Sequence, residues 1–369
     1  MKILYSCLSK SWGGMEMYTL ASALQLKNKN LNVSLLCYPD SELFNEAIRQ
    51  KLNVITSTGD KYFHPIEIIK LIKHLKKNKF DIIHSHASSD LWLIVPALRT
   101  AKIQTPLFFT KHVGSFINKK DILHNYLYNR VNIAFAISSV IKNNLLETTS
   151  LNESKIKILH NGVDTKFFDP ALVNPKEVRK EFNIYGSDIV IGMIARITWG
   201  KGYEELLKAA GSLVNEYKNL KFLLVGKASR GEEDYAEKIQ NLSGQLGLKD
   251  KVIFTGYRKD TRNLISAMDI FAFPSHSEAF GIALIEAMSM AKPSVCSNSD
   301  GILDIAVEGK TSLLFKRKDE NDLKEKLKIL IDSEQMRTKL GKAARERAIK
   351  KFDFNKITEK TIGFYNLFS

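Results

Sequence analysis

The sequence of 369 residues lacks several features that would place it in a special class of protein. No run of about 18 apolar residues occurs, so we expect no transmembrane helix. The three cysteines form no C-x-x-C pair, and we expect buried, reduced thiols in a cytoplasmic protein. The first ten residues are too polar for a secretory signal and are expected to form a strand. Low-complexity tracts and short-period repeats are also lacking.

Apolar runs in the sequence predict two α/β domains. Single hydrophobic cores stop growing near about 250–300 residues, and this chain is longer. Its short apolar runs alternate with longer amphipathic stretches, a pattern typical of parallel strands covered by helices on both faces. The alternation pauses near residue 160 and then restarts. The predicted strands lie within 1–7, 32–38, 81–86, 106–112, 133–138, 188–196, 220–226, 251–256, 270–275 and 293–298, and helices are expected at 14–27, from 203, and at 319–350 and 355–368.

Positive charge is in excess, with a formal net charge of +15. Residues 1–170 carry 22 Lys and Arg against 13 Asp and Glu. Such a surface can meet anionic membranes or phosphorylated substrates, and a plain lysine-rich surface also explains it. Nucleic acid is not an expected partner, because no recognition motif or stacking platform is present. The stretch 117–130 mixes lysines with apolar residues, which predicts either an interfacial helix or an ordinary half-buried one.

Glycine and histidine stand directly after the predicted strands of the first half, where ligands bind in open parallel sheets. Gly13 and Gly14 lead into a helix, which admits an anion close to the backbone, although a tight turn also explains them. His84 and His86 point to one face, and structural histidines are favoured over a metal site because no carboxylate cluster is nearby. His112 is a candidate for hydrogen bonding to a sugar hydroxyl or for sharing a proton.

Two cations after the first strand of the second half predict a phosphate site. Arg196 and Lys201 flank a glycine-containing turn before a helix, where they can hold a diphosphate. The Walker spacing is absent, so this is no Walker loop. No D-x-D triplet is present, and many nucleotide-sugar enzymes use such a pair to hold a metal. Arg196 and Lys201 would supply that charge without metal, unless they are unrelated surface cations.

The stretch HSEAFGIALIEAM, residues 276–288, contains two glutamates. Glu278 precedes a helix that we expect to start near Phe280, and Glu286 lies about 7–8 Å further along its axis. The N–H groups of Phe280 and Gly281 would be unpaired donors at the helix start. Each carboxylate can accept two hydroxyl hydrogen bonds from an elongated ligand. The alternative is a helix-start acid and a solvated helix residue.

Together these residues resemble the retaining glycosyltransferases of the GT-B fold, family 4 (glycosyltransferase group 1). The resemblance rests on the order of the motifs, which include "HSH", "TKH", "NGVD" at 161–164, "AR…GKG" at 195–202 and the E-x7-E pair. It implies an α/β GT-B architecture, with two Rossmann-like domains facing each other across a cleft. The expected domains are 1–168 with about 355–369, which binds the acceptor, and 169–354, which binds the nucleotide sugar. The last helix crosses back to the N-terminal domain.

The resemblance also implies roles for single residues. The expected catalytic set is Arg196, Lys201, His112 and Glu278. The expected nucleotide-sugar site consists of Gly13, Gly14, Arg196, Lys201, Glu278, Ala279, Phe280, Gly281 and Glu286, with Arg196 and Lys201 on the diphosphate, Glu286 on the ribose and Glu278 on the sugar. One departure is "DGILD", which has Asp304 where the family often has glutamate. No metal site is expected.

The implied activity is metal-independent, retaining transfer of a hexose-type sugar from a nucleoside diphosphate sugar to a glycan or lipid-linked acceptor. A UDP-sugar is favoured over a GDP-sugar, and no cofactor besides this co-substrate is expected. The expected setting is polysaccharide or lipopolysaccharide biosynthesis, in the cytoplasm or peripherally on the anionic inner face of the membrane. A sugar-nucleotide 2-epimerase of the same fold and a non-catalytic nucleotide-sugar-binding protein remain open, and product analysis without acceptor distinguishes them.

Overall fold

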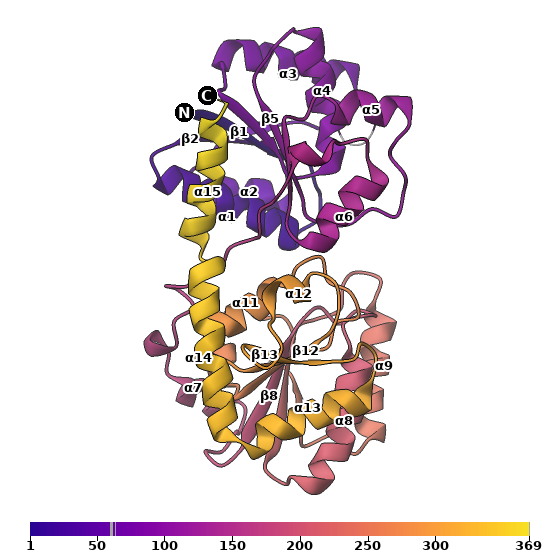
Figure 1. Ribbon diagram of the computed structural model, residues 1–369, viewed down its shortest axis with the longest axis vertical. Coiled ribbons are helices and arrows are strands. Elements are labelled where there is room, and N and C mark those ends of the chain that lie inside the picture. The colour runs from indigo at the N-terminus through magenta and orange to yellow at the C-terminus, as the bar shows by residue number, and fades with distance from the viewer. Residues whose placement is uncertain (60–61, 63, 369) are drawn as a thin grey trace. The chain divides into compact units, whose positions relative to one another are not determined.

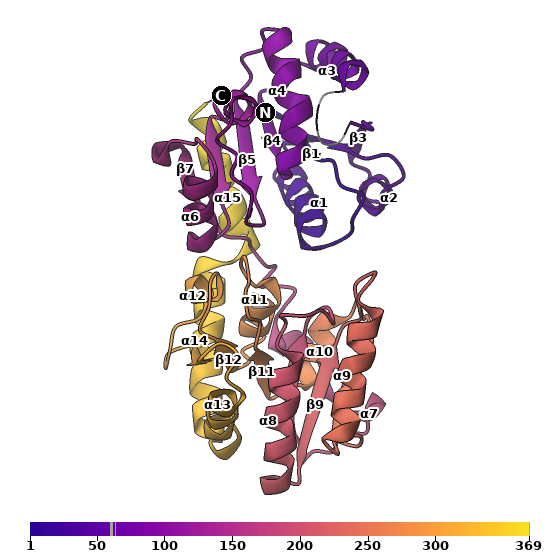
Figure 2. The ribbon, with the colours of Figure 1, turned by 90° about the vertical axis from the view of Figure 1, so that its right-hand side faces the viewer.

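The computed structural model describes residues 1–59, 62 and 64–368, and the chain divides into two compact units (Figure 1). Unit 1 contains Met1–Asn161 and Phe354–Ser369, and unit 2 contains Gly162–Asp353. Each unit is built around one parallel sheet, and Figures 1 and 2 show helices on both faces of each sheet. The apolar runs therefore predicted the architecture of two α/β domains correctly.

The sheet of unit 1 has seven strands in the order β3-β2-β1-β4-β5-β6-β7. Its central strands are almost wholly buried, because helices cover both faces, and this burial explains their continuous apolar runs. In the register, Ile3 of β1 pairs with Val33 of β2 and Ile82 of β4. The strands are β1 Lys2–Cys7, β2 Asn32–Cys37, β3 Asn53–Thr56, β4 Ile82–Ser85, β5 Leu107–Lys111, β6 Ile133–Ala136 and β7 Ile156–Ile158.

The sheet of unit 2 repeats this order with six strands, β10-β9-β8-β11-β12-β13. Strand β8 forms the centre and pairs with β9 and β11 on its two sides. Both sheets thus have the strand order of the doubly wound dinucleotide-binding fold. The strands are β8 Ile189–Ile194, β9 Leu220–Val225, β10 Val252–Phe254, β11 Ile270–Phe273, β12 Ser294–Ser297 and β13 Ser312–Phe315.

Helices connect the strands in the usual alternation. Several begin at side-chain caps; for example, Ser41 and Ser138 each accept a hydrogen bond from a backbone N–H in the first turn. The α-helices are α1 Gly14–Asn28, α2 Glu42–Arg49, α3 Pro65–Asn78, α4 Leu91–Thr100, α5 Ile122–Tyr128, α6 Ser139–Thr148, α7 Pro175–Glu181, α8 Tyr203–Glu216, α9 Glu233–Gln245, α10 Thr261–Ala267, α11 Ile282–Ser289, α12 Ile302–Ile305, α13 Glu320–Asp332, α14 Glu334–Lys351 and α15 Phe354–Asn366, and short 3₁₀ turns lie at Ser88–Asp90 (η1), Glu153–Lys155 and Pro170–Leu172.

The last helix, α15, belongs to the core of unit 1 (Figure 1). Ile357 and Tyr365 are buried with the side chains of α1, β1 and β2. The Tyr365 hydroxyl is hydrogen-bonded to His84 Nδ1 and lies 3.1 Å from the Tyr5 hydroxyl. The expectation that the C-terminal helix crosses back to the N-terminal domain is therefore confirmed.

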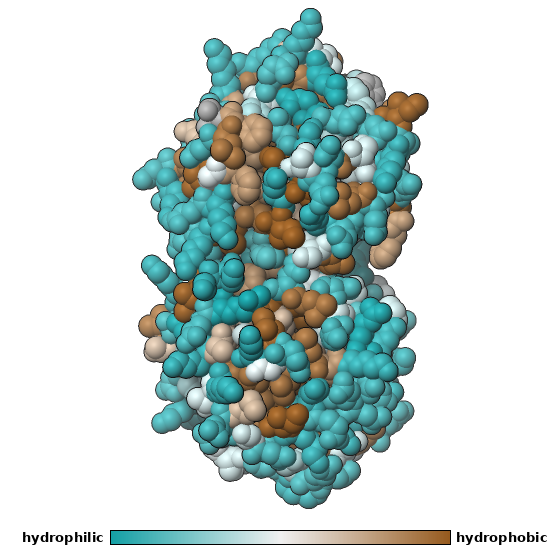
Figure 3. Space-filling model, in the orientation of Figure 1, coloured by the Kyte–Doolittle hydropathy of each residue, from teal (hydrophilic) through white to brown (hydrophobic). Residues whose placement is uncertain are grey.

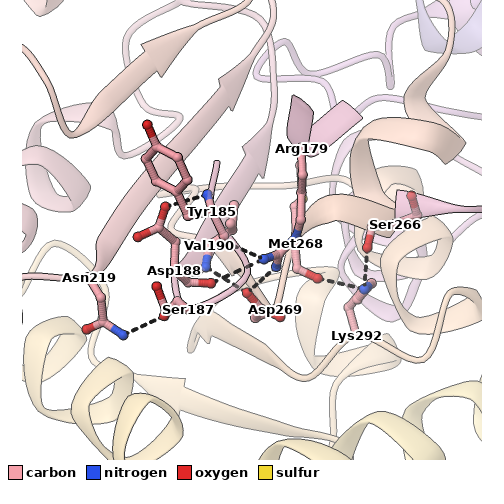
Figure 4. Close-up of polar contacts among 10 residues, drawn as sticks. All are labelled: Arg179, Tyr185, Ser187, Asp188, Val190, Asn219, Ser266, Met268, Asp269 and Lys292. Atoms are coloured by element: carbon pink, nitrogen blue, oxygen red, sulfur yellow. Dashed lines mark hydrogen bonds and ion pairs between the residues drawn. The ribbon is translucent and has the colours of Figure 1, made fainter. Parts of the chain in front are cut away.

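Charged side chains at the amino ends of the unit 2 strands are paired with the chain itself (Figure 4). Asp269 accepts from Arg179 at 2.7 Å and from the N–H of Val190 at 2.8 Å, which ties α7 to the starts of β8 and β11. The ammonium of Lys292 donates to the carbonyls of Ser266 and Met268 at 2.9 and 2.6 Å. These contacts close this end of the sheet and mark it as structural.

The segment 117–130 is not one long amphipathic helix, and that expectation is corrected. Only Ile122–Tyr128 is helical, and the preceding residues form a loop. Arg130 donates to the carbonyls of Ile103 and Thr105, so it supports the fold and is no part of a membrane-facing surface. Ile122 and Leu123 are 86% and 62% exposed, and Figure 3 shows hydrophobic side chains over the region where Figure 1 places α5.

Candidate functional site

The strand order of each sheet reverses once, between β1 and β4 in unit 1 and between β8 and β11 in unit 2. At such a switch point the loops that follow the two strands run in opposite directions and leave room for a ligand. In unit 2 these loops are 195–202 and 274–281, which contain Arg196, Lys201 and Glu278. The topology thus gathers the sequence-predicted residues of this unit at the position where doubly wound sheets bind ligands.

Close backbone packing fixes the loop before α8. Gly200 and Gly202 both have positive φ angles, 84° and 82°, which a residue with a side chain rarely adopts. A Cβ atom on Gly202 would lie 2.2 Å from the carbonyl oxygen of Pro274, so glycine lets the two switch-point loops touch. The Gly200 carbonyl accepts from the N–H of His276 at 2.8 Å. Lys201 is consequently held on a rigid turn at the start of α8.

Lys201 and Glu278 form an ion pair across the switch point. Glu278 Oε1 also accepts from Ser275 Oγ at 3.1 Å, and both charged side chains are about one-fifth exposed or less. Arg196 is exposed and donates to Ser229 Oγ at 3.2 Å, on the loop after β9. Lys201, which is expected to bind the diphosphate, and Glu278, which is expected to bind the sugar, are therefore direct neighbours. An incoming anion would compete with Glu278 for Lys201.

Helix α11 begins at Ile282, two residues later than expected from the sequence. Gly281 is its N-cap with φ 119°, and a Cβ there would lie 3.2 Å from the ring of Phe273. Phe280 is 2% exposed and packs against Phe352, so its side chain belongs to the core. Ala279 lies against Gly301, on which a Cβ would meet the Ala279 carbonyl oxygen at 2.4 Å. That Ala279 and Phe280 contact the donor through their backbone remains a prediction.

Glu286 is half-buried in the second turn of α11. Burial raises its pKa to about 7. A carboxylate in such surroundings gains from hydroxyl donors, which favour its charged form. The assignment of Glu286 to the ribose remains a prediction, and Glu278 lies on the loop that precedes the same helix.

His276 and Glu205 form a buried pair that sequence analysis missed. His276 Nε2 lies 2.8 Å from Glu205 Oε1, and the other polar atom of each side chain, Nδ1 and Oε2, is buried without a partner among the described residues. The His276 ring also meets the exposed Trp199 edge-on, at 5.7 Å between centroids. The pair joins α8 to the loop of Glu278 across 71 residues, and no spacing in the sequence signals it.

In unit 1 the glycine pair lies at the start of α1. Gly13 is the N-cap, with an extended backbone, and its N–H donates to Glu16 Oε2 at 2.9 Å. Neither glycine has a positive φ angle, and a Cβ on Gly14 would meet nothing within 4 Å. The fold itself therefore does not require glycine at position 14, and the open space beside it is available to a ligand.

His84 at the end of β4 and His86 directly after it are buried and stacked, with ring centroids 4.5 Å apart. His84 is satisfied on both nitrogens, by Tyr365 and by Thr110 Oγ1 at 2.7 Å, so the structural interpretation of this residue is confirmed. His86 shares a 3.0 Å hydrogen bond between its Nδ1 and His112 Nε2, but its own Nε2 is buried and has no partner in the part of the chain that the structure describes. His86 is thus only half satisfied by the chain.

His112 is 6% exposed and follows β5 directly. Burial, together with the neighbouring positive charge of Lys111, lowers its pKa to about 3. The imidazole is therefore neutral at physiological pH, where it can donate or accept a hydrogen bond. Of the two roles expected from the sequence, this environment favours hydrogen bonding to a hydroxyl over sharing a proton.

Within residues 1–59, 62 and 64–368, no group of three or more His, Cys, Asp or Glu side chains is placed to hold a metal ion. In the same part of the chain, none of the helices has the length and apolar content needed to cross a bilayer.

Two family matches meet near the boundary between the two units. Residues 12–167 match "Glycosyltransferase Family 4" and residues 174–347 match "Glycosyl transferases group 1". The chain is 30% identical over 241 residues to the capsular polysaccharide biosynthesis glycosyltransferase CapM of Staphylococcus aureus. This match covers 63% of the chain and 61% of CapM, which is less than two thirds of that relative's length. The chain is 28% identical over 322 residues, or 82% of each chain, to the N,N'-diacetylbacillosaminyl-diphospho-undecaprenol alpha-1,3-N-acetylgalactosaminyltransferase of Campylobacter jejuni.

Solved structures share the whole fold. A glycosyltransferase of Rickettsia africae superposes with a TM-score of 0.91 and 23% identity, covering 100% of this chain and 98% of the other. Anabaena HepE, in complex with UDP and glucose, superposes with a TM-score of 0.84 and 21% identity over 99% of both chains.

A pair of doubly wound α/β units with charged loops at their switch points defines a two-domain protein of the GT-B fold. The chain belongs to the family 4, group 1 glycosyltransferases.

Proposed function

We propose that the protein transfers a hexose-type sugar, with retention of configuration and without metal, from a nucleoside diphosphate sugar to a lipid-linked or glycan acceptor. The observation that carries the proposal is the gathering of Arg196, Lys201 and Glu278 on the two switch-point loops of unit 2, beside the half-buried Glu286. UDP is the favoured nucleotide, because the related Anabaena HepE is described in complex with UDP and with UDP-glucose.

In the proposed reaction, the bond between the sugar C1 and the diphosphate oxygen breaks while the acceptor oxygen bonds to C1 on the same face. The acceptor proton passes to the leaving phosphate. Arg196 and Lys201 stabilise the charge that grows on that phosphate, which is the electrostatic contribution that matters most in such a step. Glu278, freed from Lys201 by the diphosphate, accepts from sugar hydroxyls, and neutral His112 hydrogen-bonds near the reacting carbon.

The proposed acceptor is part of cell-surface polysaccharide or lipopolysaccharide biosynthesis. The names of two relatives support a lipid diphosphate as its carrier: the Campylobacter enzyme above and an Escherichia coli galactosyltransferase that acts on alpha-D-GlcNAc-diphosphoundecaprenol. The proposed location is the cytoplasm, with peripheral contact to the anionic inner face of the membrane through exposed Ile122 and Leu123. Flotation with anionic vesicles tests this contact, and absence of binding at low salt would refute it.

Donor hydrolysis and transfer, measured across UDP-, GDP- and ADP-sugars with a lipid diphosphate acceptor, test the function. We expect one UDP-sugar to be consumed fastest, and its sugar to appear on the acceptor with the donor's anomeric configuration. Epimerised free sugar without transfer would contradict the proposal, as would binding of every donor with no turnover.

A further inference from the structure

A pocket opens at the carboxyl ends of β4 and β5 in unit 1; Lys119 lines it, and the buried Lys111 lies behind Ser88 of its lining. Its volume is about 270 Å³. Ser88 and Ser89 of η1 and Lys119 supply much of its polar lining, and Trp92 and Ile117 much of its apolar lining. Among the described residues that line it, none is acidic. We call it the Lys111 pocket, after the buried lysine behind Ser88.

Lys111 carries a positive charge that the described chain does not neutralise. The residue is 6% exposed, and its ammonium donates to one hydroxyl, Ser88 Oγ, at 3.1 Å. Among residues 1–59, 62 and 64–368 it forms no ion pair. Burial, together with repulsion from the nearby Lys119, lowers its pKa to about 7. A buried ammonium with a single hydroxyl acceptor is costly for the free protein, and a bound anion would lower that cost.

The rim of the pocket is apolar and leads to an exposed apolar surface. Ile117 is exposed, and the half-buried Trp92 and the buried Leu127 also line the pocket with apolar side chains. Beyond Ile117, the side chain of Phe116 is fully exposed, and Ile122 and Leu123 follow at the start of α5. A ligand suited to this arrangement has an anionic group that reaches the lysines and a hydrocarbon part that leaves over the rim.

The loop that carries Lys119 is held in place by hydrogen bonds. Asn144 on α6 accepts from the N–H of Ser115 at 2.7 Å and donates to its carbonyl at 2.8 Å. The N–H of Lys119 donates to the carbonyl of Thr148 at 2.7 Å. The backbone that presents the second lysine is therefore fixed before any ligand binds, which lowers the entropy cost of binding.

We propose that the Lys111 pocket binds the phosphate groups of a lipid-linked acceptor, with Lys111, Lys119 and Ser88 contacting phosphate. Trp92, Ile117 and Leu127 contact the first segment of the hydrocarbon chain. This assignment rests on the proposed function, since it names the site for that reaction's acceptor. The pocket lies at the carboxyl ends of the unit 1 strands, which is the edge of the sheet where the proposed acceptor would bind.

The test is calorimetric titration of the full chain with farnesyl diphosphate, farnesol and inorganic pyrophosphate, in saturating UDP so that the cations of unit 2 are occupied. We expect farnesyl diphosphate to bind at least about tenfold more tightly than either partial ligand. Lys111→Met should weaken farnesyl diphosphate binding by about 10- to 100-fold, the range for a charged hydrogen bond, and leave farnesol binding unchanged. Lys119→Gln should also weaken the binding of farnesyl diphosphate.

Lys120→Met is the matched control, because Lys120 is an exposed lysine on the same loop. It should change the affinity for farnesyl diphosphate less than about twofold. Equal binding by wild type and Lys111→Met would overturn the proposal, and so would an equal loss in Lys120→Met. Pyrophosphate binding as tight as that of farnesyl diphosphate would overturn the lipid-linked assignment in favour of free phosphate. UDP binding is read in a separate titration, so its failure contradicts the proposed function alone.

Discussion

Lys292 and Lys111 are enclosed lysines at opposite ends of parallel sheets, and they differ in how the chain satisfies them. Lys292, at the amino ends of the unit 2 strands, donates to two carbonyls, and Asp269 nearby offsets part of the burial that lowers its pKa to about 8 (Figure 4). Lys111, at the carboxyl end of β5, has one hydroxyl acceptor and a second lysine as its neighbour. The chain completes the first site by itself and leaves the second one open.

The same contrast extends to other polar groups. Of six buried side-chain atoms that lack a hydrogen-bond partner in the described chain, three follow strands β4, β8 and β11 at their carboxyl ends: His86 Nε2, Glu205 Oε2 and His276 Nδ1. Unsatisfied buried polar atoms are rare in stable proteins and need a reason. Polar residues lie at both ends of each sheet. We assign the carboxyl ends to ligands, because these three buried atoms lack hydrogen-bond partners there among the residues that the structure describes.

The largest effect is expected from the cations of unit 2. Arg196→Ala and Lys201→Ala should each lower the rate of sugar transfer by about 10²- to 10³-fold, because each removes a charge that stabilises the leaving diphosphate. Lys292→Met, at the structural end, should leave the rate per folded molecule near that of wild type. Rates measured on the folded fraction check this, and near wild-type transfer by both unit 2 variants would contradict the assignment.

Glu286→Gln should weaken donor binding and stabilise the fold above neutral pH. Burial raises the pKa of Glu286 to about 7, so this carboxyl ionises at a lower pH in the unfolded chain than in the folded protein. The wild type therefore loses stability as the pH rises from about 4.5 to 7. The glutamine variant lacks this loss, so its advantage should appear across that range and reach at most about 3 kcal/mol. Denaturant melts at pH 5 and pH 8 measure it. If the stability difference between Glu286→Gln and wild type does not grow with pH, ionisation of Glu286 does not destabilise the fold.

The two lysines should respond differently to removal of their charge. Lys292→Met leaves two carbonyls without a donor and should lower the free energy of unfolding by about 2 kcal/mol. Lys111→Met removes an uncompensated buried charge, and the free energy of unfolding should stay the same or rise. Parallel denaturant melts test the pair. A similar loss in both variants would mean that Lys111 is a structural lysine like Lys292.

The smallest effect concerns α15. Tyr365→Phe removes the hydroxyl that bonds to His84 Nδ1 and lies near Tyr5, which should lower the free energy of unfolding by about 1 kcal/mol. Because His84 is structural, the KM for donor and acceptor should not change. A changed KM with unchanged stability would make this buried network part of the site.

The sequence predicted the ten strands that carry long apolar runs, and it missed β3, β7 and β13. All three are edge strands with only one neighbour in the sheet. Strands β3 and β7 are largely exposed or half-buried, so no continuous apolar run is needed to form them. The error at 117–130 has another cause. The mixture of lysines and apolar residues suggested a helix throughout, whereas only Ile122–Tyr128 is helical and the residues before it belong to a loop that Asn144 of α6 holds at Ser115.

At the candidate site, the sequence pointed to residues and the fold supplied partners. Lys201 and Glu278 each belong to a recognisable motif, but their ion pair spans 77 residues. Lys111 meets Ser88 across 23 residues, and His276 meets Glu205 across 71. Such pairs depend on strand order, which brings distant strand ends together, and a single sequence contains no spacing that signals them.

The most direct test of the account is a titration of UDP into the wild-type protein and into Lys201→Ala and Lys292→Met. If the carboxyl ends of the unit 2 strands hold the donor diphosphate, wild type and Lys292→Met bind UDP with similar affinity. Lys201→Ala should bind it at least about tenfold more weakly, since it loses a charge-assisted bond and leaves Glu278 unpaired beside the phosphates. UDP binding that is unchanged in Lys201→Ala would contradict the central claim.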